Sequence, residues 1–217
     1  MSNAPRPIKN VKNFLIKIGV SEKYLENIFT SGEAAIQSIK KFKYGKYFYH
    51  LGPDRDNHLY KGIEGSKVNL DKCDYILCTG LFDDKMENLD FYSQILSDHK
   101  NKIMVCTNPD LEVERGSKRE FCAGTIAAIF KKLGGEVIYF GKPYKEIYDL
   151  VLNKKQKALI IGDNLRTDIK GANNINQESI FILDGIHKNE IKDEVNLNSL
   201  FKKYLVIPDF IQNKLKW

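Results

Sequence analysis

Short apolar runs alternate with amphipathic stretches over most of the 217 residues. The apolar runs are expected to form strands at residues 47–51, 75–79, 102–107, 136–140, 158–162 and 180–183. Apolar residues recur at helical spacing within residues 91–96, 122–133 and 144–153, which are expected to be helices. Short apolar strands separated by helices are typical of parallel sheets that are covered on both faces. The pattern therefore predicts an α/β fold.

The first 41 residues lack strand-like runs and are expected to be mostly helical. Apolar spacing predicts a helix over residues 8–18, a second helix after Ser21 and a third after Ser31. Residues 110–119 are strongly charged and are expected to form a loop. Three regions of different pattern follow from this, at residues 1–41, 42–136 and 137–217.

The segment ALIIGDNLRTD, residues 158–168, is the first candidate for chemistry. Its apolar run stops at Gly162, Asp163 stands at the exit, and Asp168 follows at the start of an expected helix. Parallel sheets bind ligands at the carboxyl ends of their strands. Carboxylate oxygens placed there suit Mg²⁺ and the phosphate oxygens that it carries. The alternative is a plain strand–turn–helix, in which both aspartates are ordinary turn and first-turn residues.

The residues just before this segment favour a site. The run EVIYFG, residues 136–141, is followed at once by Lys142 and then by the helix expected at 144–153. Strand, helix and strand form a βαβ unit, whose right-handed crossover makes the two strands parallel in one sheet. Lys142 and Asp163 are therefore expected at the same sheet edge. A lysine there can balance the charge of the carboxylates and of a bound phosphoryl group.

Gly141-Lys142-Pro143 and residues 162–168 resemble the third and fourth motifs of the haloacid-dehalogenase (HAD)-like hydrolase superfamily. The resemblance is closer to its class IIA branch, which carries a large inserted cap and includes NagD-type and pyridoxal phosphate phosphatase-like proteins. Three further stretches also resemble the family. Ser2 to Pro7 resembles its second motif, and Thr30 to Ala34 resembles the Thr-Ser turn that follows the next helix. Thr107 to Asp110 resembles the cap motif that precedes the substrate loop.

The resemblance implies a role for each matching residue. Asp163 would be the metal ligand for Mg²⁺, while Lys142 and Asp168 would be the catalytic residues, as charge-balancing lysine and supporting carboxylate. The residues implied to bind the substrate, a small phosphorylated metabolite, are Ser2, Asn3, Asn108 and Asp110. The loop that follows Asp110, through Arg119, would carry specificity. Phosphosugars, nucleotides and pyridoxal phosphate stay equally open as substrates.

One family motif has no counterpart in these 217 residues. HAD phosphatases carry Asp-x-Asp-Gly-Thr on the first core strand, and its first aspartate is the nucleophile. Asp54-Arg55-Asp56-Asn57 has the right letters at two positions, but it follows Gly52-Pro53 in a polar loop after the second motif. We therefore expect a truncated member of the family, with its activity impaired.

The resemblance also implies how the chain is divided. It predicts a HAD-like Rossmannoid parallel-sheet core, missing its first strands, with an inserted α/β cap domain. Residues 1–41 would be the N-terminal part of the core, 42–136 the cap, and 137–217 the C-terminal part of the core. A gap of this kind in a sheet exposes strand edges. The expected macromolecular partners are accordingly a second copy, in a homodimer, or a complementing N-terminal fragment.

Composition changes this picture little. The net charge of +6 comes from scattered Lys and Arg, which mildly favours anionic ligands and gives no case for nucleic acid. With no visible signal peptide, no apolar run long enough to span a membrane, and cysteines that read as reduced, the chain is expected to be cytoplasmic with no membrane partner. His187, after Gly185-Ile186, is expected in an exposed loop.

Two functions of different classes stay open. The first is a Mg²⁺-dependent, HAD-type phosphatase that acts on small phosphate monoesters and is weakened by the missing nucleophile. The second is a non-catalytic remnant or binding module, or one part of a split enzyme that another chain complements. A Rossmann nucleotide-binding protein is set aside, because no Gly-x-Gly-x-x-Gly turn follows a strand.

Overall fold

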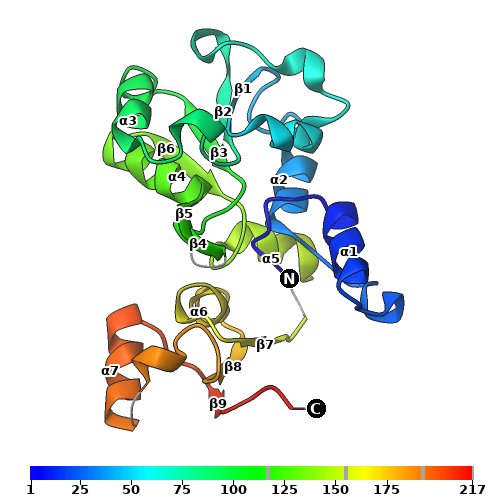
Figure 1. Cartoon of the computed structure of the whole chain (residues 1–217), viewed down its shortest axis with the longest axis vertical. Coiled ribbons are helices and arrows are strands. Elements are labelled where there is room, and N and C mark those ends of the chain that lie inside the picture. The colour runs from blue at the N-terminus through cyan, green and yellow to red at the C-terminus, as the bar shows by residue number, and fades with distance from the viewer. Residues whose placement is uncertain (116–117, 154–155, 192–193, 217) are drawn as a thin grey trace. The chain divides into compact units, whose positions relative to one another are not determined.

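The computed structural model describes residues 1–115, 118–153, 156–191 and 194–216. The chain forms two compact units, residues 1–141 and residues 142–217, whose elements are labelled in Figure 1. The boundary falls between Gly141 and Lys142, so the expected Gly-Lys-Pro motif begins in one unit and ends in the other. Each unit has its own parallel sheet.

The first unit is built on a four-stranded sheet in the order β1-β2-β3-β6, with all pairs parallel. Its strands are β1 (Phe48–Leu51), β2 (Tyr75–Cys78), β3 (Ile103–Cys106) and β6 (Glu136–Tyr139). Helix α3 (Leu89–Ser97) connects β2 to β3, and α4 (Ala123–Lys132) precedes β6. Because strand order follows chain order, right-handed crossovers place both helices on one face, where they pack against each other (Figure 1).

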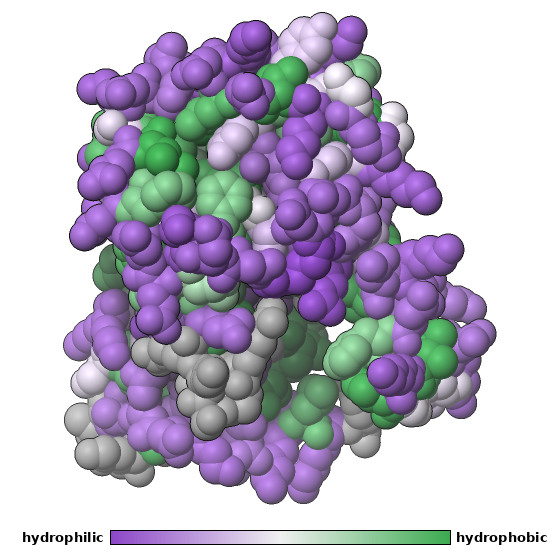
Figure 2. Space-filling model, turned by 45° about the horizontal axis from the view of Figure 1, so that its top comes forward, coloured by the Kyte–Doolittle hydropathy of each residue, from purple (hydrophilic) through white to green (hydrophobic). Residues whose placement is uncertain are grey.

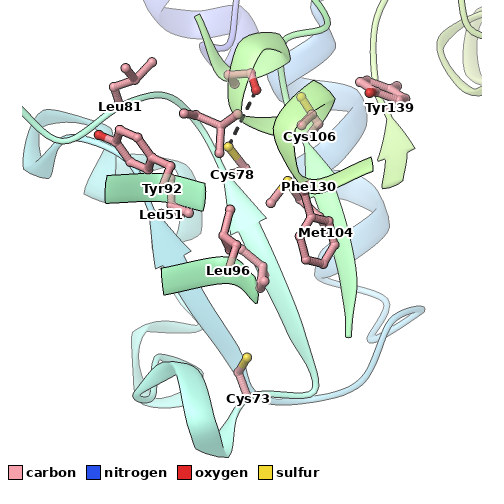
Figure 3. Close-up of a cluster of buried hydrophobic side chains, with 14 residues drawn as sticks. Leu51, Cys73, Cys78, Leu81, Tyr92, Leu96, Met104, Cys106, Phe130 and Tyr139 are labelled. Carbon is pink, nitrogen blue, oxygen red and sulfur yellow. Dashed lines mark hydrogen bonds between the residues drawn. The ribbon is translucent and has the colours of Figure 1, made fainter. Parts of the chain in front are cut away.

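The core of this unit lies between the sheet and these two helices (Figure 3). Strand β2 is buried along its whole length, as expected for an apolar strand inside a covered parallel sheet. Tyr92 and Leu96 of α3, with Ile126 and Phe130 of α4, are fully buried. These side chains follow the helical spacing that the sequence pattern indicated.

All four cysteines lie in this unit and are buried. Cys78 and Cys106 lie within the core cluster, and Figure 3 shows the Cys78 thiol directed at the Ala123 carbonyl oxygen, 3.9 Å away. Burial raises the pKa of the Cys106 thiol to about 12. The thiol is therefore protonated at neutral pH and acts as a small apolar side chain.

Three short elements precede the sheet: α1 (Ile8–Lys17), the 3₁₀ turn η1 (Glu22–Tyr24) and α2 (Ser31–Ile39). Thr30 caps α2, because its side-chain oxygen accepts a 3.1 Å hydrogen bond from Glu33 N–H. The second expected helix is wrong, since only η1 forms there. The reason is that Phe29 and Thr30 are drawn into extended pairing with Ser2, which ends helical winding before them.

The charged segment that follows Asp110 is a hairpin rather than the expected loop. Strands β4 (Glu112–Arg115) and β5 (Lys118–Phe121) pair antiparallel, with Glu112 opposite Phe121. Two four-residue strands this rich in charge lack the apolar alternation by which a hairpin is recognised in sequence. The side chains of residues 114–119 lie outside the described part, so the specificity role of this segment stays a prediction.

The second unit holds a three-stranded parallel sheet in the order β7-β8-β9. Its strands are β7 (Leu159–Gly162), β8 (Glu178–Ile182) and β9 (Phe210–Gln212), and its helices are α5 (Lys145–Val151), the π-helical turn η6 (Leu165–Ile169), α6 (Lys170–Asn174) and α7 (Glu194–Tyr204). Leu165 and Ile169 of η6 pack with Phe181 of β8 and Leu200 of α7 in a small core. Further 3₁₀ turns are η2 (Asp54–Tyr60), η3 (Glu64–Ser66), η4 (Leu70–Lys72), η5 (Asp83–Lys85) and η7 (Lys188–Glu190).

The expected βαβ unit of β6, α5 and β7 does not form. Each of the three elements is present, but β6 pairs with β3 in the first unit and β7 pairs with β8 in the second. The crossover that leads into β6 starts at β3 and runs through α4. Apolar runs show that a segment is a buried strand, but they do not show which neighbour it pairs with.

The α/β class with parallel sheets is confirmed. No helix in the described ranges is long and apolar enough to cross a membrane. The face shown in Figure 2 is mostly hydrophilic, and hydrophobic side chains gather there only in separate patches.

Candidate active site

Asp163 stands directly after β7, at the carboxyl end of that strand. Its Oδ2 atom accepts a 3.0 Å hydrogen bond from the backbone N–H of Ile186, in the loop that follows β8. The carboxylate is therefore held between the exits of two neighbouring parallel strands. This edge is where open α/β sheets bind their ligands.

Lys142 and Asp168 form a partly buried ion pair. Lys142 Nζ lies 2.5 Å from Asp168 Oδ1, and the two side chains are only 16% and 9% exposed. Asp168 Oδ2 accepts a 3.2 Å hydrogen bond from Asn164 N–H. A Cβ atom added at Gly162 would lie 2.2 Å from Asp168 Cγ, so the carboxylate occupies the space over that glycine. The structure thus brings Lys142 and Asp168 together beside the residue that precedes Asp163.

The turn from β7 into α6 is wound as a π-helix, η6. Asn164 caps it, because its Oδ1 atom accepts a 2.9 Å hydrogen bond from Arg166 N–H. Asp168 N–H donates a 2.9 Å hydrogen bond back to the Asn164 carbonyl oxygen. Single π-helical turns are concentrated at functional sites. Here the turn directs Asp168 back toward the end of β7.

Tyr148 of α5 lies behind the ion pair. Its hydroxyl is buried and has no hydrogen-bond partner among the described residues. Desolvation by burial, and secondarily the nearby charge of Asp168, raises the pKa of Tyr148 above its usual range. The hydroxyl therefore stays protonated, which avoids a second negative charge next to Asp168.

His187 is buried, only 4% exposed, which corrects the expectation of an exposed loop. Its Nε2 atom accepts a 3.2 Å hydrogen bond from Leu165 N–H, so the proton is on Nδ1, which lies 2.7 Å from Glu190 Oε1. The hydrogen bond from His187 holds the pKa of Glu190 down, to about 2. His187 therefore positions the turn after Asp163. The only hint in the sequence was its place just after a strand.

The four residues expected to bind substrate all lie in the first unit. Asn3 Nδ2 donates a 3.0 Å hydrogen bond to Asp110 Oδ1, and Asn108 Oδ1 accepts a 3.0 Å hydrogen bond from Asp110 N–H. Ser2 Oγ accepts a 3.2 Å hydrogen bond from Ala4 N–H. The structure thus brings Asn3, Asn108 and Asp110 into one hydrogen-bonded group, although more than a hundred residues separate Asn3 from the other two.

The donor chemistry of the two aspartates fits Mg²⁺ in part. Carboxylate oxygens are the hard ligands that this ion prefers. Both oxygens of Asp168 are hydrogen-bonded, whereas the bond from Ile186 engages only one oxygen of Asp163. Within the described ranges, no group of three His, Cys, Asp or Glu side chains is arranged to hold a metal ion. Asp163 is therefore the better candidate ligand of the two, and further oxygens would have to complete an octahedral shell.

Comparison with known proteins bears on this site directly. A HAD-hydrolase-like family model matches residues 139–212, which include Lys142, Asp163 and Asp168. Ribonucleotide monophosphatase NagD of Escherichia coli (strain K12) is 38% identical over 86 residues, which cover 38% of this chain and 34% of NagD. A cardiolipin synthase/mitochondrial hydrolase fusion protein of Schizosaccharomyces pombe is 35% identical over 79 residues, 29% of this chain and 13% of that protein. The chain thus spans about a third or less of the length of these curated relatives.

Solved structures are similar over nearly the whole chain. A haloacid dehalogenase-like hydrolase from Brucella suis 1330 matches with a TM-score of 0.79 at 27% identity, covering 100% of this chain and 82% of that one. A p-nitrophenyl phosphatase from Archaeoglobus fulgidus matches with a TM-score of 0.73 at 20% identity, covering 98% and 80%. At the latter identity the likeness establishes the fold alone.

The matched segment and the fold make this chain similar to the HAD-like hydrolases. Within that class the similarity is to the NagD-type phosphatases, which confirms the resemblance carried by the motifs. The limits of core and cap at residues 41 and 136 stay predictions.

Proposed function

We propose that the chain supplies the metal-binding and charge-balancing part of a Mg²⁺-dependent phosphatase for small phosphate monoesters. The observation that carries the proposal is the Lys142–Asp168 ion pair at the end of β7, within the segment that the HAD-hydrolase-like family model matches. A cation that lies 2.5 Å from a carboxylate, at a sheet edge beside a second aspartate, is arranged to compensate additional negative charge.

Each residue has a distinct task in this proposal. Asp163 would hold Mg²⁺, which when bound would neutralise the charge on phosphoryl oxygens. Lys142, held by Asp168, would share its positive charge with the same oxygens. Ser2 and Asn3 would bind the phosphoryl group, and Asn108 and Asp110 would fix the loop that carries specificity, as their shared hydrogen bonds support.

The Asp-x-Asp-Gly-Thr motif, which carries the family's nucleophilic aspartate, does not occur in these 217 residues. Asp54 and Asp56 lie on η2 of the first unit, where Asp56 is only 9% exposed and hydrogen-bonds to Thr79. We therefore propose that the nucleophile comes from a segment outside the 217 residues, of this or another chain. In its absence the chain would bind the metal and phosphate weakly and turn over slowly.

Calorimetry with Mg²⁺ tests the metal site. Weak binding is expected, on the order of millimolar, because water would have to fill most of the shell. Asp163→Ala should abolish it, whereas Asp184→Ala should not. Asp184 serves as the control carboxylate, because it follows the neighbouring strand β8 and is engaged by Lys188 and Lys214. Tight binding, or binding that depends on Asp184, would contradict the assignment.

Hydrolysis of p-nitrophenyl phosphate tests the incomplete site. The purified 217-residue chain should be close to inactive with Mg²⁺. A typical enzymatic rate that Asp163→Asn removes would show that the described residues already form a complete site. A chain that stays inactive after a strand with Asp-x-Asp-Gly is supplied would favour the non-catalytic binding module.

A further inference from the structure

A pocket of about 420 Å³ opens on the first unit, between the start of α1 and the turn η2. Arg6, Lys9, Asn10 and Asn13 line it from one side, and Arg55 and His58 from the other. The two sides are more than forty residues apart in the sequence. Its volume lies within the range of sites for small ligands. None of the residues proposed for phosphate hydrolysis lines it.

The charge of this lining is unbalanced. In the described part of the chain neither Arg6 nor Lys9 forms an ion pair, whereas Arg55 is paired with Asp83. The only acidic side chain in the lining is Asp56, which is almost fully buried. At least two cations therefore face one cavity with a single carboxylate beneath them. Such a concentration of like charge costs free energy unless an anion or solvent compensates it.

The side of the pocket that carries Arg6 is fixed by its backbone. Thr30 Oγ1 donates a 2.6 Å hydrogen bond to the Arg6 carbonyl oxygen, and Ile8 N–H donates a 3.3 Å hydrogen bond to Glu33 Oε2. A Cβ atom at Gly32 would lie 2.5 Å from Arg6 N, so this backbone rests directly on the first turn of α2. The backbone of Arg6 is thereby held at the pocket, and among the described residues its side chain forms no ion pair.

The opposite side is fixed as well. His58 Nδ1 lies 2.7 Å from the Arg55 carbonyl oxygen, so Nδ1 carries the donated proton and Nε2 is left for other contacts. Beneath it, Asp56 hydrogen-bonds to Thr79, and Arg55, His58 and Arg6 all act on its charge. Desolvation by burial outweighs these contacts and raises the pKa of Asp56 above its usual value. The carboxylate of Asp56 therefore has three basic side chains near it, those of Arg6, Arg55 and His58.

We propose that this pocket binds a small multivalent anion that carries a phosphoryl group. Arg6 and Lys9 supply the charge, and Arg55, His58, Asn10 and Asn13 are placed to donate hydrogen bonds. Guanidinium groups suit phosphoryl oxygens because they offer two parallel N–H donors. The site uses neither Lys142 nor Asp163 nor Asp168, so it stands or falls independently of the proposed phosphatase site.

Titration calorimetry of the full chain with pyrophosphate, in EDTA so that no metal contributes, tests the proposal. Arg6→Gln/Lys9→Gln should weaken binding by about tenfold or more, the loss expected for two charge-assisted contacts. The matched control is Lys131→Gln/Lys132→Gln at the end of α4, which removes the same charge from exposed residues of the same unit. It should change the affinity by less than about twofold.

Asp56→Asn gives a result of opposite sign. Because Asp56 is the acidic residue of the lining, its neutral replacement should tighten pyrophosphate binding several-fold, while Asp71→Asn on the exposed η4 should not. The proposal would be overturned if Arg6→Gln/Lys9→Gln and Lys131→Gln/Lys132→Gln weakened pyrophosphate binding equally. Equal weakening would mean that the anion responds only to the total charge of the protein. Loss of binding in Lys142→Gln with Arg6→Gln/Lys9→Gln unaffected would also overturn it, by assigning the anion to the Lys142–Asp168 pair.

Discussion

Side-chain size at single positions decides where the polar groups of the second unit lie. Gly171 of α6 is the clearest case, because a Cβ atom there would lie 1.9 Å from the Tyr148 hydroxyl oxygen and 2.8 Å from Cζ. The tyrosine ring is therefore pressed against the backbone of α6, and its hydroxyl is buried without a partner in the described ranges. An unmade hydrogen bond is accepted here because the ring fills the space between α5 and α6.

Gly171→Ala should lower the free energy of unfolding by about 1–3 kcal/mol, because overpacking a buried contact forces the ring or the helix to move. Tyr148→Phe should recover part of this loss in the double variant, since it removes the hydroxyl but leaves Cζ in place. Gly65→Ala is the control, because nothing lies within 4 Å of a Cβ atom at that position. Urea unfolding measures all four proteins. An undiminished stability of Gly171→Ala would show that α5 and α6 are not packed this closely.

The Lys142–Asp168 ion pair can be weighed by a double-mutant cycle. Lys142→Ala alone should cost about 1–3 kcal/mol of unfolding free energy, because it leaves the Asp168 carboxylate buried without its cation. The double variant Lys142→Ala/Asp168→Ala should lose less than the sum of the single changes. The exposed pair Lys145–Asp149 is the comparison and should show a coupling below about 0.5 kcal/mol. Equal coupling in the two pairs would mean that Lys142 is solvated rather than held by Asp168.

At the scale of elements, the carboxyl edge of the first unit's sheet gathers buried polar side chains. His50 near the end of β1 and Thr79 just after β2 are each 4% exposed, and Asn108 follows β3. His50 Nε2 lies 2.9 Å from Thr79 Oγ1, and Nδ1 lies 3.4 Å from the Tyr60 hydroxyl. Parallel strands bring their carboxyl ends to one edge, so residues far apart in the chain form one polar layer there.

Burial of His50 predicts an acid limit to stability. Desolvation, with a smaller effect of Lys67, lowers the pKa of His50 from 6.5 to about 4. The unfolded chain therefore binds a proton between these values while the folded chain does not. Stability present above pH 6.5 is then lost as the pH falls toward 4, by up to about 3 kcal/mol. His50→Gln should flatten this part of the profile of unfolding free energy against pH, whereas His58→Gln, at an exposed position, should not. A profile unchanged in His50→Gln would contradict the buried, uncharged state.

At the scale of the whole molecule, the sheet of the second unit ends at the edge strand β7. Strand β7 pairs with β8, and on its other side no strand pairs with it in the part of the chain that the structure describes. Leu159 and Ile161 of β7 are 48% and 37% exposed. An exposed edge with apolar side chains and unpaired backbone groups can accept another strand.

A peptide or fusion that carries an apolar strand followed by Asp-x-Asp-Gly should therefore bind to the edge of β7 and raise the melting temperature. The added strand would form hydrogen bonds with unpaired backbone groups and cover apolar surface. It should also create Mg²⁺-dependent hydrolysis of p-nitrophenyl phosphate. Replacing the first added aspartate with asparagine should abolish hydrolysis but keep the stabilisation, since the amide has the same shape and cannot act as nucleophile. Differential scanning calorimetry and the phosphatase assay separate the two effects. Hydrolysis with no rise in melting temperature would contradict this prediction, because the added strand would then not bind at an open sheet edge.

The sequence by itself determined most of the elements and the class of the protein. The apolar runs mark strands β1, β2, β3, β6, β7 and β8 to within one or two residues, because the strands of parallel sheets are rich in apolar residues. The motif around Asp163 and Asp168 was visible in the sequence because an apolar run, residues 158–161, is followed directly by Gly162 and Asp163. Helix α7 escaped the sequence analysis, and the charged hairpin of β4 and β5 was taken for a loop, because neither has a strong apolar pattern.

Only the tertiary structure decided which elements meet. Contacts between segments far apart in the chain decide three features of the structure. They pair β6 with β3 rather than with β7, they bury His187, and they bring Arg6 and Arg55 to one pocket. Local pattern reports how one segment is buried, whereas a partner is selected by the packing of the complete unit. The Asn3–Asp110 hydrogen bond shows the same limit, because spacing in sequence does not encode a distance between loops.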